Sequence, residues 1–293
     1  MEIAERPAWV DDELFPFQSR FLDLDGHRVH YVDEGSGLTL LFLHGNPTWS
    51  FDYSTVTTLL REDFRCIAVD YPGFGLSTAA PGYRYLPAEH AAVIGGFVDA
   101  LGLSNVTLVG HDWGGPIGLA VVQDRPEIFD RLVLTNTWAW PVSDPLIQVM
   151  SHVMGSPIGR LLIRQLNLFV NVMIPIGHRL TTPTSGQMDH YKKALDSPAR
   201  REASAVFPRE ITSSRAFLAD IEAGLEDIAA LPTLIIWGDG DFAFGDKELR
   251  RWQQTFTDHE TVIVSGAGHF VPSDAPEQFA AAIRRWHIRA GSQ

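Results

Sequence analysis

The chain has 293 residues, which is enough for one large α/β domain or two small ones with a sizeable buried core. Hydrophobic residues make up 45% of the chain and charged residues 20%, as in soluble globular proteins, and the net charge of −13 argues against nucleic acid and anionic membrane as partners. No run reaches transmembrane length, the N-terminus lacks a signal-peptide core, and the single cysteine Cys66 excludes internal disulfides, so we expect a cytoplasmic protein.

The first half of the chain predicts strands alternating with helices, the pattern of a parallel sheet with right-handed crossovers. Asp25-Gly26 lies between two strand-like runs and indicates a hairpin turn. Gly102 is a plausible stop for a helix. The expected elements are two strands within 21–33, buried strands at 38–43, 64–69 and 105–109, a helix at 89–101 and a strand at 132–136.

The alternation then breaks, because residues 138–225 are helix-like and interrupted by seven prolines. Strand patterning returns at 233–238 and 261–264, and a closing helix is expected over 275–289. We therefore predict an α/β fold with a mostly parallel, doubly wound sheet. Its core comprises 1–137 and 226–293, and a helical cap of residues 138–225 is inserted after the sixth strand, over the crevice where such sheets bind ligands.

The most informative motif is Gly110-His111-Asp112-Trp113-Gly114, which follows an apolar run and precedes a helix. Its Gly-x-Asp-x-Gly spacing is that of a nucleophile elbow, a turn so sharp that its central residue is strained and its neighbours must be small. Serine is the usual central residue, whereas Asp112 stands here. The alternative interpretation is a tight turn in which Asp112 only caps the helix.

A carboxylate nucleophile needs a base for the second half of its reaction. Of the 11 histidines, three lie at predicted strand ends beside glycine turns: His44, His111 and His269. His44 and His111 belong to the loop and elbow motifs themselves. His269, just after the last predicted strand, is therefore the candidate base.

The base in turn needs an acid that orients it. We choose Asp241, in the loop after the strand at 233–238, over its rival Asp239, which is closer to the strand end. The resulting order of Asp112, Asp241 and His269 matches the nucleophile, acid and histidine order of α/β-hydrolases.

Three segments carry a resemblance to the haloalkane dehalogenases: His44-Gly45-Asn46-Pro47-Thr48-Trp49, the elbow, and Gly268-His269-Phe270. The resemblance implies an α/β-hydrolase fold and implies that the side chains of Asn46 and Trp113 bind the leaving halide. It also implies that the backbone N–H groups of Asn46 and Trp113 form the oxyanion hole. Some subfamilies place the acid after the sixth strand as Glu, where this chain has Asn136. The combination of Asn46 with a late Asp is similar to the third subfamily.

The chemistry is consistent with an aspartate at the elbow. A carboxylate can displace halide from an sp³ carbon and leave an alkyl ester on Asp112, which His269-activated water can hydrolyse. A serine would leave an ether, which water does not cleave readily. We therefore predict a hydrolase whose partners are a small apolar halogenated substrate, water and halide, with no metal or organic cofactor. The sequence predicts neither the preferred haloalkane nor the oligomeric state.

Aromatic side chains of the cap and nearby loops are candidates for the apolar walls of the substrate pocket, although core packing is an equally good interpretation of each. The candidates are Trp138, Trp140, Phe169, Phe207, Phe217, Phe244 and Phe270.

Other functions fit less well. An epoxide hydrolase uses the same Asp and His machinery, but that family typically places two tyrosines in the cap, and this cap has only Tyr191. A fluoroacetate dehalogenase would need arginines beside the nucleophile, and an esterase would need Ser at position 112. A non-catalytic binding protein on the same fold would have a degenerate triad, whereas all three candidate positions are occupied here.

Overall fold

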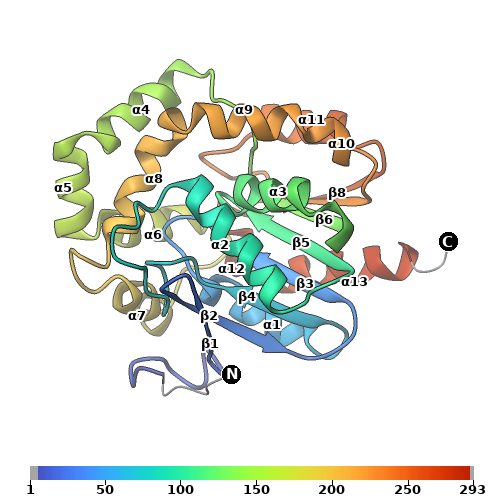
Figure 1. Ribbon diagram of the computed structural model, residues 1–293, viewed down its shortest axis with the longest axis horizontal. Coiled ribbons are helices and arrows are strands. Elements are labelled where there is room, and N and C mark those ends of the chain that lie inside the picture. Colours follow the sequence, from blue (N-terminus) through green and yellow to red (C-terminus); the bar gives the residue numbers. More distant parts are fainter. Residues whose placement is uncertain (1–5, 291–293) are drawn as a thin grey trace.

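The computed structural model describes residues 6–290 and is built on one eight-stranded sheet (Figure 1). The strand order is β1-β2-β4-β3-β5-β6-β7-β8, with β1 and β2 antiparallel to their neighbours and all later pairs parallel. This confirms the predicted α/β class and mostly parallel sheet. The strands are β1 (Arg20–Leu24), β2 (His27–Glu34), β3 (Thr39–Leu43), β4 (Arg65–Val69), β5 (Val106–His111), β6 (Phe129–Thr135), β7 (Thr233–Gly238) and β8 (His259–Val264).

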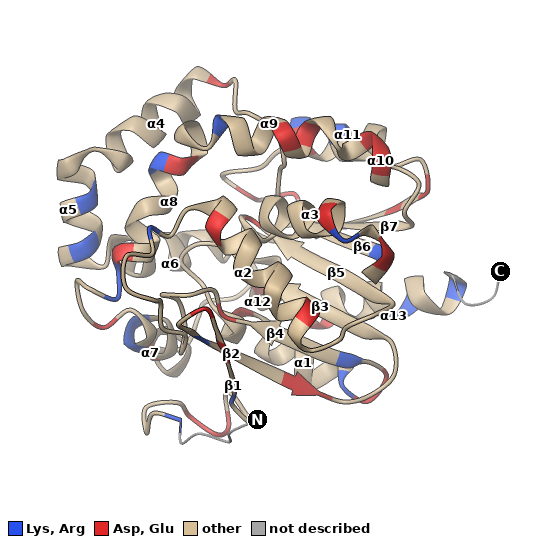
Figure 2. Cartoon of the chain, viewed as in Figure 1, with Lys and Arg blue, Asp and Glu red and all other residues tan. Residues whose placement is uncertain are grey.

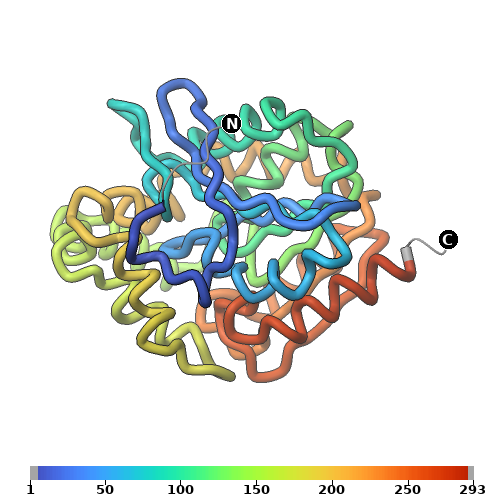
Figure 3. The backbone as a smooth tube through the Cα atoms, turned by 90° about the horizontal axis from the view of Figure 1, so that it is seen from below, coloured from blue at the N-terminus to red at the C-terminus, as the bar shows by residue number. Residues whose placement is uncertain are grey.

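Helices cover both faces of the sheet, because the central strands are apolar on both sides. In β3, Leu41 and Leu43 belong to one core cluster and Leu40 and Phe42 to the other. One face is covered by α2 (Pro87–Ala100), α3 (Gly114–Asp124), α10 (Leu225–Ile228) and α11 (Asp246–Thr255). The other is covered by α1 (Ser54–Leu60), α12 (Val271–Asp274) and α13 (Pro276–Ala290), and Figure 3 shows α1 and α13 side by side.

Several local predictions are confirmed. Asp25 and Gly26 both have positive φ, 50° and 83°, as a tight hairpin turn requires. Gly102, at φ 58°, follows the end of α2. Helix α1 was not expected from the sequence, because its Ser-Thr-Val-Thr-Thr start has low intrinsic helix propensity; packing against α13 and β4 stabilises it instead.

The chain between β6 and β7 forms helices, as expected. They are α4 (Pro145–Gly155), α5 (Pro157–Leu166), α6 (Ile174–Gly177), α7 (Ser185–Ala194), α8 (Glu202–Ser213), α9 (Arg215–Ala223) and α10. Helices α4, α5 and α8 pack together, whereas α9 and α10 pack on α3, so the boundary at residue 225 remains a hypothesis. Within residues 6–290 no single helix is long and apolar enough to cross a membrane; only α4 and α5 taken together, bent by 68°, have the length and composition.

Candidate active site

Asp112 stands at a strained strand-to-helix turn between β5 and α3. Its φ is 50°, in the left-handed region that side chains other than glycine rarely adopt. A Cβ on Gly114 would collide with the carbonyl oxygen of Leu43 in β3, so only glycine allows the turn to pack against that strand. The geometry is that of the nucleophile elbow inferred from the motif.

Two backbone donors hold the carboxylate of Asp112. Its Oδ1 accepts a hydrogen bond from the N–H of Asn46 at 2.9 Å, and the N–H of Trp113 also hydrogen-bonds to the carboxyl group. A Cβ on Gly45 would collide with the Asp112 side chain, so the close approach of the two loops depends on glycine there. These two N–H groups are the ones that the family resemblance assigns to the oxyanion hole.

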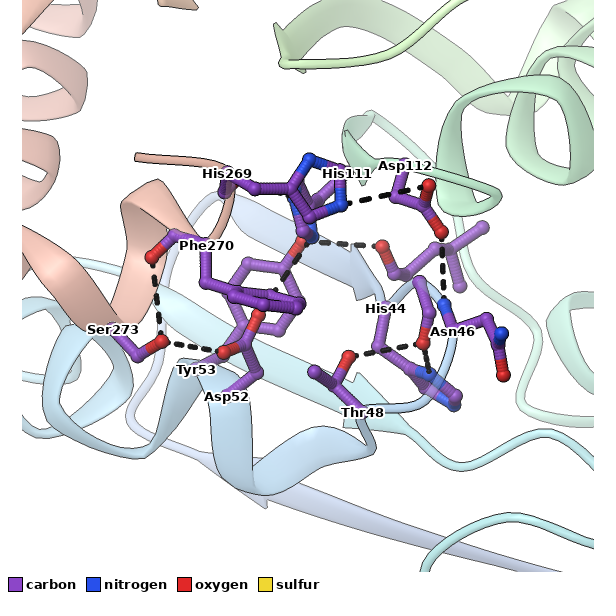
Figure 4. A network of polar contacts seen from close by, with 12 residues as sticks. His44, Asn46, Thr48, Asp52, Tyr53, His111, Asp112, His269, Phe270 and Ser273 are labelled. Carbon is purple, nitrogen blue, oxygen red and sulfur yellow. Dashed lines mark hydrogen bonds and ion pairs between the residues drawn. The ribbon is translucent and has the colours of Figure 1, made fainter. Parts of the chain in front are cut away.

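His44 fixes the loop that carries Asn46 (Figure 4). Its Nε2 accepts from the N–H of Tyr71 at 3.3 Å, so the proton lies on Nδ1, which donates to the carbonyl oxygen of Gly45 at 2.9 Å. Thr48 Oγ1 donates to the same oxygen at 3.0 Å. Burial lowers the pKa of His44 to about 4, so this imidazole is neutral at pH 7 and serves as a support.

His269 lies between two carboxylates. Its Nε2 is 3.7 Å from Asp112 Oδ2, and its Nδ1 donates to Asp241 Oδ2 at 3.0 Å. The rival Asp239 faces elsewhere, since its Oδ1 accepts from the N–H of Gly266 at 2.6 Å. The structure thus brings together the three residues that the sequence singled out, and it separates Asp239 from them.

The environment sets the charges of these three groups. Burial by itself would lower the pKa of His269, but Asp241, its hydrogen bond and the nearby charges of Asp112 and Asp52 together raise it to about 9. Burial raises the pKa of Asp112 above its ordinary value against the opposing effects of His269 and the two N–H donors. Burial also disfavours the Asp241 carboxylate, but the charge and hydrogen bond of His269 outweigh it and keep the pKa of Asp241 below its ordinary value.

Asn136 contributes to the site in a way the sequence did not indicate. Its amide donates to Asp241 Oδ2 at 2.9 Å, and its Oδ1 accepts from the N–H of Gly238 at 2.9 Å. In the next position, Thr137 Oγ1 donates to the carbonyl oxygen of Asp112 at 2.6 Å. Polar residues at the carboxyl end of β6 were the available signal, but the sequence analysis treated Asn136 only as a position where the acid is missing.

A second buried network, also missed, lies beneath His269. His111 Nε2 donates to the carbonyl oxygen of His269 at 2.8 Å, and its Nδ1 is 3.7 Å from Asp52 Oδ2. Asp52 Oδ1 in turn accepts from Ser273 at 2.6 Å and from Tyr191 at 3.2 Å. Burial raises the pKa of Asp52 and lowers that of His111 to about 3, so the His111 imidazole is neutral at pH 7 and its Nε2–H braces the His269 loop (Figure 4).

Comparisons with known proteins agree with this geometry. Residues 39–276 match the alpha/beta hydrolase fold family. The chain is 44% identical over 277 residues to "Haloalkane dehalogenase 2" of Mycobacterium bovis, an alignment that covers 93% of this chain and 96% of that protein. The chain belongs to the haloalkane dehalogenase family.

Two further comparisons give one solved structure and one relative with a different printed name. The crystal structure of haloalkane dehalogenase DatA from Agrobacterium tumefaciens C58 superposes with a TM-score of 0.83 at 27% identity, covering 92% of this chain and 96% of that one. The chain is also 31% identical over 285 residues to "Cis-3-alkyl-4-alkyloxetan-2-one decarboxylase" of Shewanella oneidensis, covering 94% of this chain and 90% of that protein.

In this dehalogenase-family site, four of the predicted pocket aromatics surround the catalytic candidates. Trp138 and Phe207 pack against Trp113 with ring centroids 4.7 Å and 5.0 Å away. Phe244 and Phe270 pack against His269 at 5.7 Å and 4.8 Å. Among residues 6–290, the buried indole N–H of Trp138 finds no acceptor, which leaves one donor available beside Trp113.

The other pocket predictions lack such contacts. Trp140 packs on Trp252 at 4.7 Å, and Arg251 covers its ring, so its position fits core packing rather than a pocket wall. Neither Phe169 nor Phe217 makes a ring contact with a catalytic candidate in the described part of the chain. Phe242, whose ring is 5.4 Å from that of His269 and half exposed, was not predicted.

Proposed function

We propose that this chain hydrolyses haloalkanes to a primary alcohol and halide through a covalent ester on Asp112. One observation carries the proposal: the elbow nucleophile is a carboxylate that the N–H groups of Asn46 and Trp113 hold, and its Oδ2 faces His269. A carboxylate attacks an sp³ carbon and leaves an ester that water can hydrolyse. Membership of the haloalkane dehalogenase family supports the same reaction.

In the first half-reaction, Asp112 displaces halide, which leaves with the electrons of its bond to carbon. Negative charge grows on the halide, so donors aimed at it in a buried site stabilise the transition state more than the ground state. The side chain of Asn46 and the indole N–H groups near the elbow are the candidate donors. Trp113 is 3% exposed, so its side chain lies in a largely dry part of the site, where an interaction with an anion is stronger than in water.

In the second half-reaction, His269 removes a proton from water, and the resulting hydroxide attacks the ester carbonyl of Asp112. Alkylation replaces the Asp112 carboxylate by a neutral ester and so removes one of the charges that raise the pKa of His269. The base is therefore easier to deprotonate when it is needed. Asp241 keeps the proton on Nδ1, so that Nε2 faces Asp112 as the acceptor.

The geometry does not support the epoxide-hydrolase alternative. Tyr191, the cap tyrosine that would have to donate to an epoxide oxygen, is fully buried, and its hydroxyl donates to Asp52 instead. A second candidate is decarboxylation of an oxetan-2-one, the activity named for the relative at 31% identity. Opening of that ring would release a carboxylate at the place where a dehalogenase releases halide, so the same donors suit both leaving groups.

The deciding experiment measures halide release from 1-chloro-, 1-bromo- and 1-iodoalkanes, diol formation from styrene oxide, and carbon dioxide release from a cis-dialkyl oxetan-2-one. We expect multiple-turnover halide release that is lost in Asp112→Ala. Carbon dioxide release without halide release would establish the second candidate, and diol formation alone would establish the epoxide hydrolase.

The halide-binding role of Trp113 has a separate test. Trp113→Phe removes one charge-assisted hydrogen bond, worth about 1.5–3 kcal/mol, and should slow halide formation about tenfold or more. Bromide should also quench the indole fluorescence of the variant less. Trp140→Phe is the matched control, because its indole packs on Trp252 away from the elbow. Unchanged turnover of bromoalkanes by Trp113→Phe would remove Trp113 from the halide site.

A further inference from the structure

The cap carries most of the exposed apolar surface of the molecule. Among residues 6–290, fifteen large hydrophobic side chains are exposed, and eleven of them lie between residues 146 and 180. Eight of the eleven project from α4 and α5 and are called the cap face here: Leu146, Val149, Met150, Val153, Ile158, Leu161, Leu162 and Leu166. Soluble monomers rarely expose so many contiguous large apolar residues without a function.

Helix α4 presents its apolar side outward. Its buried side holds Ser151, whose hydroxyl donates to the carbonyl oxygen of Pro208 in α8 at 2.7 Å, and Gly155, which lies against Arg209. Leu146, by contrast, is 78% exposed. An ordinary surface helix buries its apolar stripe against the core, so the reversed orientation of α4 indicates that its stripe faces a partner.

Helix α5 extends the same surface. Within α5, Ile163 is buried against the rest of the protein, whereas Ile158 is 72% exposed to solvent. Two arginines, Arg160 and Arg164, form ion pairs with Glu202 of α8. Figures 1 and 3 agree that α4 and α5 form the edge of the molecule opposite the C-terminal helix α13.

The charge around the cap face differs from that of the whole chain. The chain has 36 acidic residues, yet residues 145–188 contain none, and α5 carries Arg160 and Arg164. Figure 2 shows basic residues on α5 and no acidic residue on α4 or α5. The net charge of −13 therefore does not describe this surface.

We infer that the cap face docks on the surface of a lipid bilayer. The apolar side chains would enter the boundary between headgroups and acyl chains, while Arg160 and Arg164, which share the single carboxylate of Glu202, keep a net positive charge that attracts lipid phosphates. This differs from the expectation, drawn above from net charge alone, that no membrane is a partner. It goes beyond the proposed function and rests on the surface alone, whatever the substrate.

A second copy of the chain fits the cap face less well. Two cap faces packed together would bring four arginines into one interface with only the two Glu202 carboxylates to pair them, because Arg160 and Arg164 share one Glu202 in each copy. If instead an acidic surface of the second copy covered the cap face, carboxylates would be buried against leucine and isoleucine, which is unfavourable for unpaired charges. A lipid bilayer has anionic phosphates at its surface and hydrocarbon just below, so it can contact the arginines and the apolar side chains of the cap face at the same time.

The test is flotation of the full-length protein with vesicles of phosphatidylcholine alone and with an equal part of phosphatidylglycerol. We expect the wild type to float with both and more strongly with the anionic vesicles. Leu146→Ser combined with Ile158→Ser should lower the bound fraction on the order of tenfold. The matched control, Leu38→Ser combined with Ile263→Ser, removes one exposed Leu and one exposed Ile outside the cap face and should bind like the wild type.

Circular dichroism of each variant shows that it is folded, and flotation requires no substrate, so the result is independent of the proposed activity. Wild-type protein that stays with neither vesicle would overturn the proposal, as would equal loss of binding in both double variants. Light scattering after size-exclusion chromatography measures the oligomeric state and so tests the remaining alternative, in which a second copy of the chain covers the cap face. If the wild type is an oligomer that the cap-face variant dissociates, and no vesicle binding occurs, a second copy covers this face.

Discussion

His269→Phe should release about one halide per active site from a bromoalkane and then stop. Displacement requires only the ionised Asp112 and the halide donors, because a carboxylate has no proton to lose. Hydrolysis of the ester requires His269, whose Nε2 is 3.7 Å from Asp112 Oδ2 and is the only histidine nitrogen placed there in the described part of the chain. Intact-protein mass spectrometry should show a mass increase equal to the alkyl group, and peptide mapping should locate it on Asp112.

Two controls accompany this prediction. Asp112→Ala should show neither the burst nor the adduct. His259→Phe, which changes an exposed histidine at the start of β8, should turn over like the wild type. Continuous turnover by His269→Phe would mean that another group activates the water, and an adduct on a residue other than Asp112 would exclude the proposed nucleophile.

Asp241→Asn should reduce turnover by a factor on the order of 10³ to 10⁴, the loss typical when the orienting acid of a triad is made neutral. The carboxylate accepts the Nδ1 proton of His269 at 3.0 Å and an Asn136 amide proton at 2.9 Å. An amide at position 241 cannot supply the charge that stabilises the imidazolium, and it permits the wrong imidazole tautomer.

Asp239→Asn is the matched control for this substitution, because it makes the same chemical change in the same loop. It should cost less than about tenfold in turnover, since Asp239 binds Gly266 and Ser265 and not His269. Steady-state halide release by both variants checks the prediction. The reverse order of effects would transfer the acid role to Asp239, and two mild effects would show that His269 works without either carboxylate.

The residues that the sequence located best are those whose local geometry restricts their neighbours. Gly110 and Gly114 mark the elbow because a Cβ at either position meets backbone, and this restriction is visible as a spacing of four residues. The order of strands, loops and histidine then placed Asp241 and His269 at neighbouring strand ends. Short-range steric restrictions and the order of elements along the chain were therefore sufficient to predict the elbow, Asp241 and His269.

Support from distant residues was not predictable in the same way. Asp52 reaches Ser273, 221 positions later in the chain, and neither residue belongs to a motif. Trp140 and Trp138 are two positions apart and chemically identical, yet one packs on Trp252 and the other on Trp113. Composition also gave no indication that α4 turns its apolar stripe outward, because the pattern of an amphipathic helix does not say which side the protein covers.

A single turnover in water enriched in oxygen-18 tests the covalent mechanism most directly. With enzyme in excess over a bromoalkane, the alcohol takes its oxygen from the Asp112 carboxylate, and the attacking water leaves its oxygen in that carboxylate. We predict unlabelled alcohol in the first turnover and a peptide containing Asp112 that is heavier by one oxygen-18 substitution. Labelled alcohol with an unlabelled Asp112 would show that water attacks the substrate directly, and would contradict the ester mechanism.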